Sequence, residues 1–213
     1  MASVLPDYLG EDAGGRVIVA HLGHGASLCA LQGGKSMATT MGFTPLDGIP
    51  MATRPGALDP GVLLYLLQES SLSAAALDEL LNHQSGLLGL SGFSGDMRQL
   101  LADDRPEAQQ AIEYFVHHTR RAIGSLVAVL GGLDALVFTA GIGEHAPTVR
   151  ASICDTLGWL GIELDAAKNQ SNACFISSTD ARVPVCVIAT DEELIIAQHT
   201  CSLLRMDEHG NYD

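Results

Sequence analysis

The hydrophobic and polar positions along the chain predict strands near the N-terminus. Arg16–Leu22 is rich in β-branched residues, and Ala26–Leu31 and Lys35–Met41 follow it with a glycine turn before each. Strands joined by such tight turns are typical of an antiparallel meander. Residues 1–15 show no clear period, so they are expected to form a loose N-terminal segment.

Helical periodicity is clearest in Pro106–Leu130, where apolar residues recur mainly at steps of three and four up to Gly131. Two shorter helices are predicted before it, one from Asp59 to about Glu69 and one over Ser73–Asn82, each with a residue that can cap its first turn. Asp96–Ala102 predicts a further short helix.

Glycine and proline divide the rest of the chain. They predict loops over Gly42–Pro60 and Gly86–Gly95, and long loops inside a compact domain are usually functional. Strands and helices then alternate, which makes the chain an α/β domain with a mixed sheet. The predicted elements of this second half are the strand Asp134–Thr139, the helix Pro147–Leu157, the strands Cys174–Ser177 and Val183–Ile188, and the helix Asp191–Leu204.

Composition narrows the class of protein. Of the 213 residues, 47% are hydrophobic and 17% charged, so the chain has the apolar surface that ordering requires. The formal net charge of −14 argues against a nucleic-acid partner, which needs a basic surface. The sequence has neither a signal peptide nor an apolar run of about 18–20 residues, so we expect a cytoplasmic protein without a membrane partner.

The five cysteines have no C-x-x-C spacing, and most have apolar neighbours. Reduced, buried thiols in a cytosolic protein explain this pattern. They are Cys29, Cys154, Cys174, Cys186 and Cys201.

Two predicted strands end in glycine-rich turns, Gly23–Gly25 and Ala140–Gly143. Glycine lets backbone N–H groups approach a phosphate without a Cβ in the way, and a helix N-terminus beyond the turn would strengthen the attraction. An ordinary hairpin and an ordinary strand–helix connection explain the same residues. Neither turn matches a Walker loop or G-x-G-x-x-G.

Taken in order, the motifs of this chain resemble those of the acetate kinase family, the acetate and propionate kinases. The likeness runs from about Arg16 to Leu204, and several motifs in one order are more specific than any of them alone. The motifs are Ile18–Leu28 (IVAHLGHGASL), Met41–Gly48 (MGFTPLDG), Thr53–Gly56 (TRPG), Asp59-Pro60, Ser91–Arg98 (SGFSGDMR), Phe138–Glu144 (FTAGIGE) and Thr190–Leu194 (TDEEL).

The resemblance implies an actin/hexokinase-like ATPase fold, of the ribonuclease H-like kind. Residues 16–205 would be a C-terminal nucleotide-binding domain, and residues 206–213 a tail. It further implies phosphoryl transfer between ATP and acetate or another short carboxylate, with ADP and an acyl phosphate as products and Mg²⁺ as cofactor. A homodimer is implied as well.

The resemblance also implies the roles of individual residues. Arg54 would stabilise the transferring phosphoryl group, although a surface cation is the alternative for a loop arginine. Glu192 would help to hold Mg²⁺, and an acid in the first turn of a helix explains it equally well. The nucleotide-binding residues would be His21, Gly23, His24, Gly25, Asp96, Met97, Arg98, Gly141, Ile142, Gly143, Glu144 and His145.

Some positions depart from the family pattern. The family has Asn at His24 and at His145, and Asp at Ala38. No segment resembles the family's N-terminal half, which carries most of the carboxylate pocket. We therefore expect little or no kinase activity from this chain alone, and a separate N-terminal half as a partner.

The alternative is a non-catalytic nucleotide-binding or dimerisation module. The apolar stripe of Pro106–Leu130 could serve such a dimer, or it could pack against the domain's own sheet.

Overall fold

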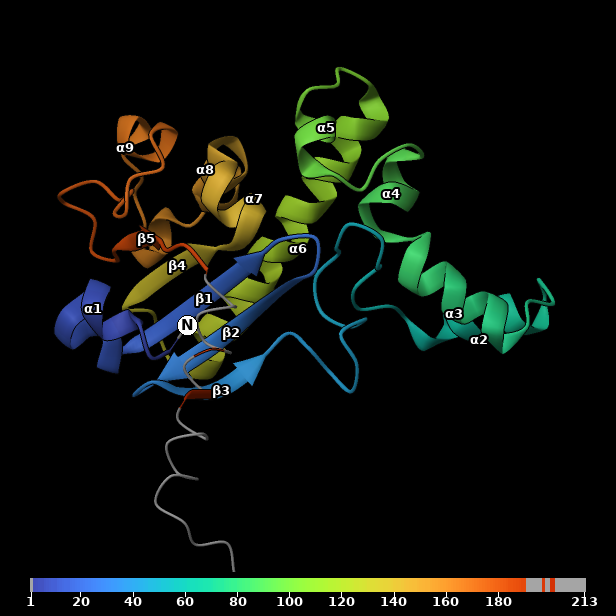
Figure 1. The fold of residues 1–213 in the computed structure, drawn as a ribbon, viewed down its shortest axis with the longest axis horizontal. Helices are drawn as coiled ribbons and strands as arrows, with labels where there is room; N and C mark the ends of the chain where they lie inside the picture. The colour runs from blue at the N-terminus through green and yellow to red at the C-terminus, as the bar shows by residue number, and fades with distance from the viewer. Residues whose placement is uncertain (1, 191–196, 198–199, 202–213) are drawn as a thin grey trace, which may run out of the picture.

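A computed structural model describes residues 2–190, 197, 200 and 201, and its centre is a mixed five-stranded sheet (Figure 1). The predicted meander is confirmed: β1 (Arg16–Leu22) pairs antiparallel with β2 (Ala26–Gln32), and β2 pairs antiparallel with β3 (Lys35–Thr39). On the other side of β1, β4 (Ala135–Thr139) and β5 (Val185–Val187) run parallel to it. The α/β class with a mixed sheet is therefore confirmed.

The long helix α6 (Pro106–Leu130) has the predicted bounds and covers one face of the sheet. Its Phe115 and Ile123 are fully buried, in one core with Ile18 and Ala20 of β1. Gly131 ends the helix in the left-handed conformation, with φ +71°. The apolar stripe is thus occupied by the domain's own sheet, which was the second of the two interpretations.

The opposite face of the sheet has its own core, and the N-terminal residues belong to it. Residues predicted to form a loose segment instead form α1 (Leu5–Leu9) and the 3-10 helix η1 (Gly10–Gly14). Leu5 is buried in one cluster with Val17 and Val19 of β1. These two valines alternate along the strand with Ile18 and Ala20, so their side chains lie on the face of the sheet opposite to α6. The prediction was wrong because elements of five residues are too short to display a period.

The helices α2 (Pro60–Gln68) and α3 (Ala74–His83) form an arm that projects away from the sheet (Figure 1). The predicted caps are confirmed, because Asp59 accepts a hydrogen bond from Gly61 N and Ser73 accepts one from Ala76 N. None of the residues of α2 is buried. Its large exposed apolar side chains are Val62, Leu64, Tyr65 and Leu67.

Two predicted loops are partly helical. α4 (Gly86–Ser91) lies within the glycine-rich segment before α5 (Met97–Leu101), and α7 (Ala140–His145) replaces the expected turn after β4. Tertiary contacts override the weak helical preference of glycine at these places. Gly86, for example, has φ +60° and lies so close to the Met51 carbonyl that no side chain would fit.

The remaining elements differ from prediction mainly in length. α8 (Pro147–Cys154) is shorter than expected, and Cys174–Ser177 makes only isolated bridges instead of a strand. The short helices η2 (Gly158–Leu160) and α9 (Ala166–Gln170) were not predicted. The predicted helix Asp191–Leu204 lies mostly outside the described residues.

The five cysteines are free, but only Cys154 and Cys186 are buried. Burial raises the pKa of each of these two thiols to about 12, which keeps them protonated and unreactive at neutral pH. Cys174 and Cys201 are exposed, contrary to the expectation of buried thiols. Through the described part of the chain, no helix combines the length and apolar character that a membrane crossing requires.

The packing of α1 can be tested by truncating one side chain. Leu5→Ala should lower the free energy of unfolding by about 2–4 kcal/mol, because it removes a fully buried leucine from the second core. Tyr8→Ala, on the exposed side of the same helix, should cost less than about 1 kcal/mol. Urea denaturation measures both, and equal losses would show that α1 is not part of the core.

Candidate active site

The parallel pairing of β1 with β4 brings two distant turns together. His21 pairs with Thr139 at the carboxyl ends of the two strands. As a result Gly23 lies beside Ala140: a Cβ on Gly23 would be 3.4 Å from the Ala140 Cβ. Ligands of α/β proteins bind at this edge of the sheet, outside the carboxyl ends of the strands.

A cleft of about 330 Å³ opens at this edge, and we call it the central cleft. Three segments that are far apart in sequence line it: the turn after β1, the start of α5, and α7. Eight of the sequence-predicted residues are among its lining residues. They are Gly23, His24, Asp96, Met97, Arg98, Gly141, Ile142 and His145.

The start of α5 carries a charged pair into the central cleft. Asp96 caps the helix by accepting a hydrogen bond from Arg98 N at 2.9 Å, and its other oxygen accepts one from Arg98 Nη2 at 2.7 Å. The Arg98 guanidinium lowers the pKa of Asp96, so this carboxyl is ionised at neutral pH. The side chain of Arg98 is 89% exposed and remains accessible to a ligand.

Hydrogen bonds among serines shape the turn that leads to Asp96. Ser91 Oγ accepts from Ser94 N at 3.1 Å, and Ser94 Oγ accepts from Asp96 N at 3.0 Å. Gly95 lies against the Ala52 carbonyl, where a Cβ would come within 2.5 Å of the oxygen. These contacts explain why the S-G-F-S-G-D motif needs serine and glycine at those places.

Helix α7 presents one face to the central cleft and another to the sheet. Gly141 is exposed, and a Cβ there would meet no protein atom within 4 Å. Gly143 is buried next to Phe138. Glu144 does not line the central cleft. Its Oε1 accepts hydrogen bonds from Ala140 N at 2.9 Å and Thr190 N at 3.0 Å.

The start of α7 is strained, and Glu144 stabilises it. Ala140 has φ +65°, a left-handed conformation that costs a residue other than glycine about 1–3 kcal/mol. The hydrogen bond from Ala140 N to the Glu144 carboxylate fixes this conformation.

Arg54 lies next to the turn Gly23–Gly25. Its Nη1 is 3.7 Å from the place that a Cβ on Gly25 would take, and it donates to Pro45 O at 3.4 Å. Ala52 N donates to His24 O at 3.1 Å, which ties the loop before Arg54 to the same turn. The half-buried guanidinium of Arg54 therefore lies beside the turn that joins β1 and β2.

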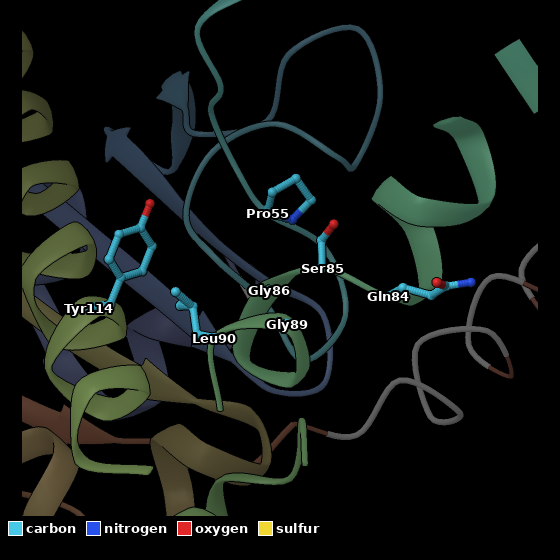
Figure 2. Close-up of a pocket in the computed structure, with 7 residues that line it drawn as sticks. All are labelled: Pro55, Gln84, Ser85, Gly86, Gly89, Leu90 and Tyr114. Carbon is cyan, nitrogen blue, oxygen red and sulfur yellow. The ribbon is translucent and has the colours of Figure 1, made fainter. Parts of the chain in front are cut away.

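Hydrogen bonds from the start of helix α4 hold the loop that contains Arg54. Leu87 N donates to Met51 O and Ser85 N to Thr53 O, both at 2.9 Å. Figure 2 shows the pocket of about 230 Å³ behind this loop, with Pro55 and Ser85 close together and Tyr114 of α6 facing them. Among the residues that the structure describes, none of the predicted site residues lines this second pocket.

The structure leaves some predicted residues outside the lining of the central cleft. His21, Gly25, Gly143 and Glu144 lie close to it without lining it, and Glu192 lies outside the described residues. Gly95, Leu101 and Ala146 do line it and were not predicted individually. Gly95 belongs to a recognised motif, whereas Leu101 and Ala146 have no sequence signal.

Metal binding was predicted for Glu192 alone. Over the described residues, no group of three or more His, Cys, Asp or Glu side chains has a metal-binding arrangement. Thr190, the residue at which the described part of the motif Thr190–Leu194 ends, donates from N to Glu144 Oε1. Magnesium commonly uses only one or two protein carboxylates together with substrate phosphates.

The mixed sheet, with its cleft at the carboxyl ends of β1 and β4, defines an α/β domain of the actin-like ATPase fold. Residues 5–198 match the Acetokinase family, and the chain belongs to that family. It is 56% identical to the acetate kinase of Nitrobacter hamburgensis over 204 residues and 58% identical to that of Methylocella silvestris over 192 residues.

Solved structures agree with this assignment. The crystal structure of Porphyromonas gingivalis acetate kinase matches 95% of this chain with a TM-score of 0.90 and 37% identity. A propionate kinase from Francisella tularensis matches 92% with a TM-score of 0.86 and 42% identity.

The matches cover only part of each relative. The two curated acetate kinases match 96% and 90% of this chain, but these regions are 50% and 48% of the relatives themselves. The two solved structures are covered to 53% and 51%. The chain therefore spans about half the length of these relatives.

Filling the central cleft from Gly141 tests its role. If the central cleft holds the nucleotide that the family resemblance implies, Gly141→Leu should weaken ADP binding at least about tenfold, because the new side chain extends into the cleft without meeting protein atoms first. The stability of the fold should not fall, since leucine is the better helix former. Gly124→Leu in α6 is the control, and calorimetric titration compares the two. Unchanged ADP affinity in Gly141→Leu would place the nucleotide elsewhere.

Proposed function

We propose that this chain supplies the nucleotide-binding side of a carboxylate phosphotransferase, which transfers a phosphoryl group between ATP and acetate or another short carboxylate. The observation that carries the proposal is the meeting of three glycine-containing motifs in one cleft at the carboxyl edge of β1 and β4. In the sequence the first and the last of these motifs lie more than a hundred residues apart.

The lining of the central cleft suits a nucleotide. Gly141 leaves space for a ligand at the N-terminal end of α7, and Arg98 and His24 offer polar donors. Leu101 and Ile142 give apolar surface for a base. Because the net charge is −14, attraction for phosphates has to come from these local groups.

Arg54 is the proposed catalytic residue. Charge in a phosphoryl-transfer transition state spreads over the equatorial oxygens, and a guanidinium presents a planar set of donors to them. Its position beside Gly25 supports this role, because Gly25 belongs to the turn that we propose to bind phosphate. Glu192 would be a ligand of Mg²⁺, which neutralises phosphate charge when it is bound.

The complete reaction needs the half of the relatives that this chain does not cover. In a two-lobed kinase the reacting groups meet in the cleft between the lobes, and closure aligns donor and acceptor. One wall binds a nucleotide but cannot align the carboxylate, and alignment supplies much of the rate. We place such a protein in the cytoplasm, where ATP is available.

The isolated chain should bind ADP and transfer little phosphate. Calorimetry should show 1:1 ADP binding, whereas trapping of acyl phosphate with hydroxylamine should give at least about 100-fold less turnover than a full-length relative.

Supplying a separately expressed N-terminal half should restore turnover with native Arg54 but not with Arg54→Ala. Full turnover by the chain alone would contradict the proposal, and so would an absence of ADP binding.

We also propose that the chain pairs with a second copy through the α2–α3 arm (Pro60–His83). The support is the arm's exposed apolar surface, since Leu64 and Tyr65 of α2 are 55% and 61% exposed. Such side chains are typical of interface centres.

Sedimentation velocity tests the dimer. The native chain should sediment as a dimer at about 50 µM, a concentration at which a dimer of micromolar affinity is largely assembled. Leu64→Glu should give monomers, because it would bury an unpaired charge in the interface. Val129→Glu, at an exposed position of α6, should leave the dimer intact. A monomeric native chain would remove this proposal but not the nucleotide site.

A further inference from the structure

Arg150 of α8 is among the largest fully buried side chains of the described residues, and the nucleotide site does not explain it. All five N–H donors of its guanidinium are used. Nε donates to Asn169 Oδ1 at 2.8 Å, Nη1 to the carbonyls of Gly143 and Glu144 at 2.8 and 2.9 Å, and Nη2 to Asn169 O and Asn172 Oδ1 at 2.7 Å each.

The five acceptors are neutral oxygens. A buried cation is costly unless its hydrogen bonds are satisfied, and burial lowers the pKa of Arg150. A purely structural core position would be filled more cheaply by an apolar side chain. The role of Arg150 therefore depends on which segments its five hydrogen bonds hold in place.

Two of the acceptors are carbonyls at the end of α7, the helix whose Gly141, Ile142 and His145 line the central cleft. The other three belong to α9 and the turn after it. Asn169 in turn donates from Nδ2 to Pro147 O at 2.8 Å, so the anchor is itself fixed to the start of α8.

The opposite end of α7 is held by Glu144, whose carboxylate binds Ala140 N. Both ends of this six-residue helix are thus fixed by charged side chains that do not line the cleft. A helix this short has little stability of its own in water, so its orientation depends on such contacts.

We propose that Arg150 is a positioning residue for nucleotide binding: it fixes the last turn of α7 at the orientation in which Gly141, Ile142 and His145 form the cleft wall. This inference rests on the proposed nucleotide site. Arg150 does not touch the nucleotide and acts through the Gly143 and Glu144 carbonyls.

Arg150→Lys keeps the positive charge but leaves at most three of the five hydrogen bonds. In this variant we expect ADP affinity to fall about tenfold, since small misplacements of binding groups have effects of this size or larger. Backbone amides of residues 140–146 should also exchange hydrogen faster. Both are measured at a temperature at which circular dichroism shows the protein to be folded.

Arg120→Lys is the matched control. Arg120 also donates to backbone carbonyls, those of Ser152 and Ile153, and both of these acceptors belong to α8 rather than α7. This variant should lose stability while ADP affinity stays within about twofold. A merely structural Arg150 would behave in the same way, because global stability does not change affinity while the chain stays folded.

If Arg150→Lys fails to fold, Asn172→Gly replaces it. Asn172 has φ +51°, which suits glycine, and the change removes one acceptor of Arg150 without backbone strain. We expect a loss of ADP affinity of about threefold. Native ADP affinity in the folded Arg150 or Asn172 variant overturns this inference alone, whereas a native chain that binds no ADP overturns the proposed function as well.

Discussion

The parallel pairing of β1 with β4 is the interaction on which the site depends. The strands are separated by more than a hundred residues, and their register sets His21 beside Thr139. Because parallel strands end at the same edge, the turns that follow them meet there. The start of α5 and helix α7 complete the lining of the central cleft at this edge.

The helix that forms one wall of the cleft is too short to be stable alone. α7 begins with Ala140 in a strained conformation and contains two glycines. Its orientation depends on Glu144 at one end and Arg150 at the other. The Glu144 carboxylate accepts a hydrogen bond from Ala140 N, and the Arg150 guanidinium donates one to Gly143 O. A preorganised wall lowers the cost of ordering when a nucleotide binds.

A chain that spans about half the length of its relatives can still have a core of its own. The helices α6 and α8 contribute to the core on one face of the sheet and α1 and η1 to the core on the other, and the central strands β1 and β4 are buried between them. Under the proposed function, the opposing wall of the cleft would come from the half of the relatives that this chain does not match. This separation of folding from function accounts for a well-packed chain that is proposed to bind nucleotide without efficient transfer.

The sequence alone predicted most of the fold. The meander, the bounds of α6 and the caps Asp59 and Ser73 follow from local periodicity and hydrogen bonding, which neighbouring residues decide. Two of the five-residue helices, α1 and α9, were not predicted, because helices shorter than two turns display little periodicity.

For the site, the ordered motifs indicated the family and eight residues that line the central cleft. Only the tertiary structure decided that Glu144 binds backbone amides, that Leu101 lines the cleft and that Arg150 is buried beneath α7. The reason is physical: a motif specifies which residue types are present. The direction in which a side chain points depends on contacts with segments that are distant along the chain.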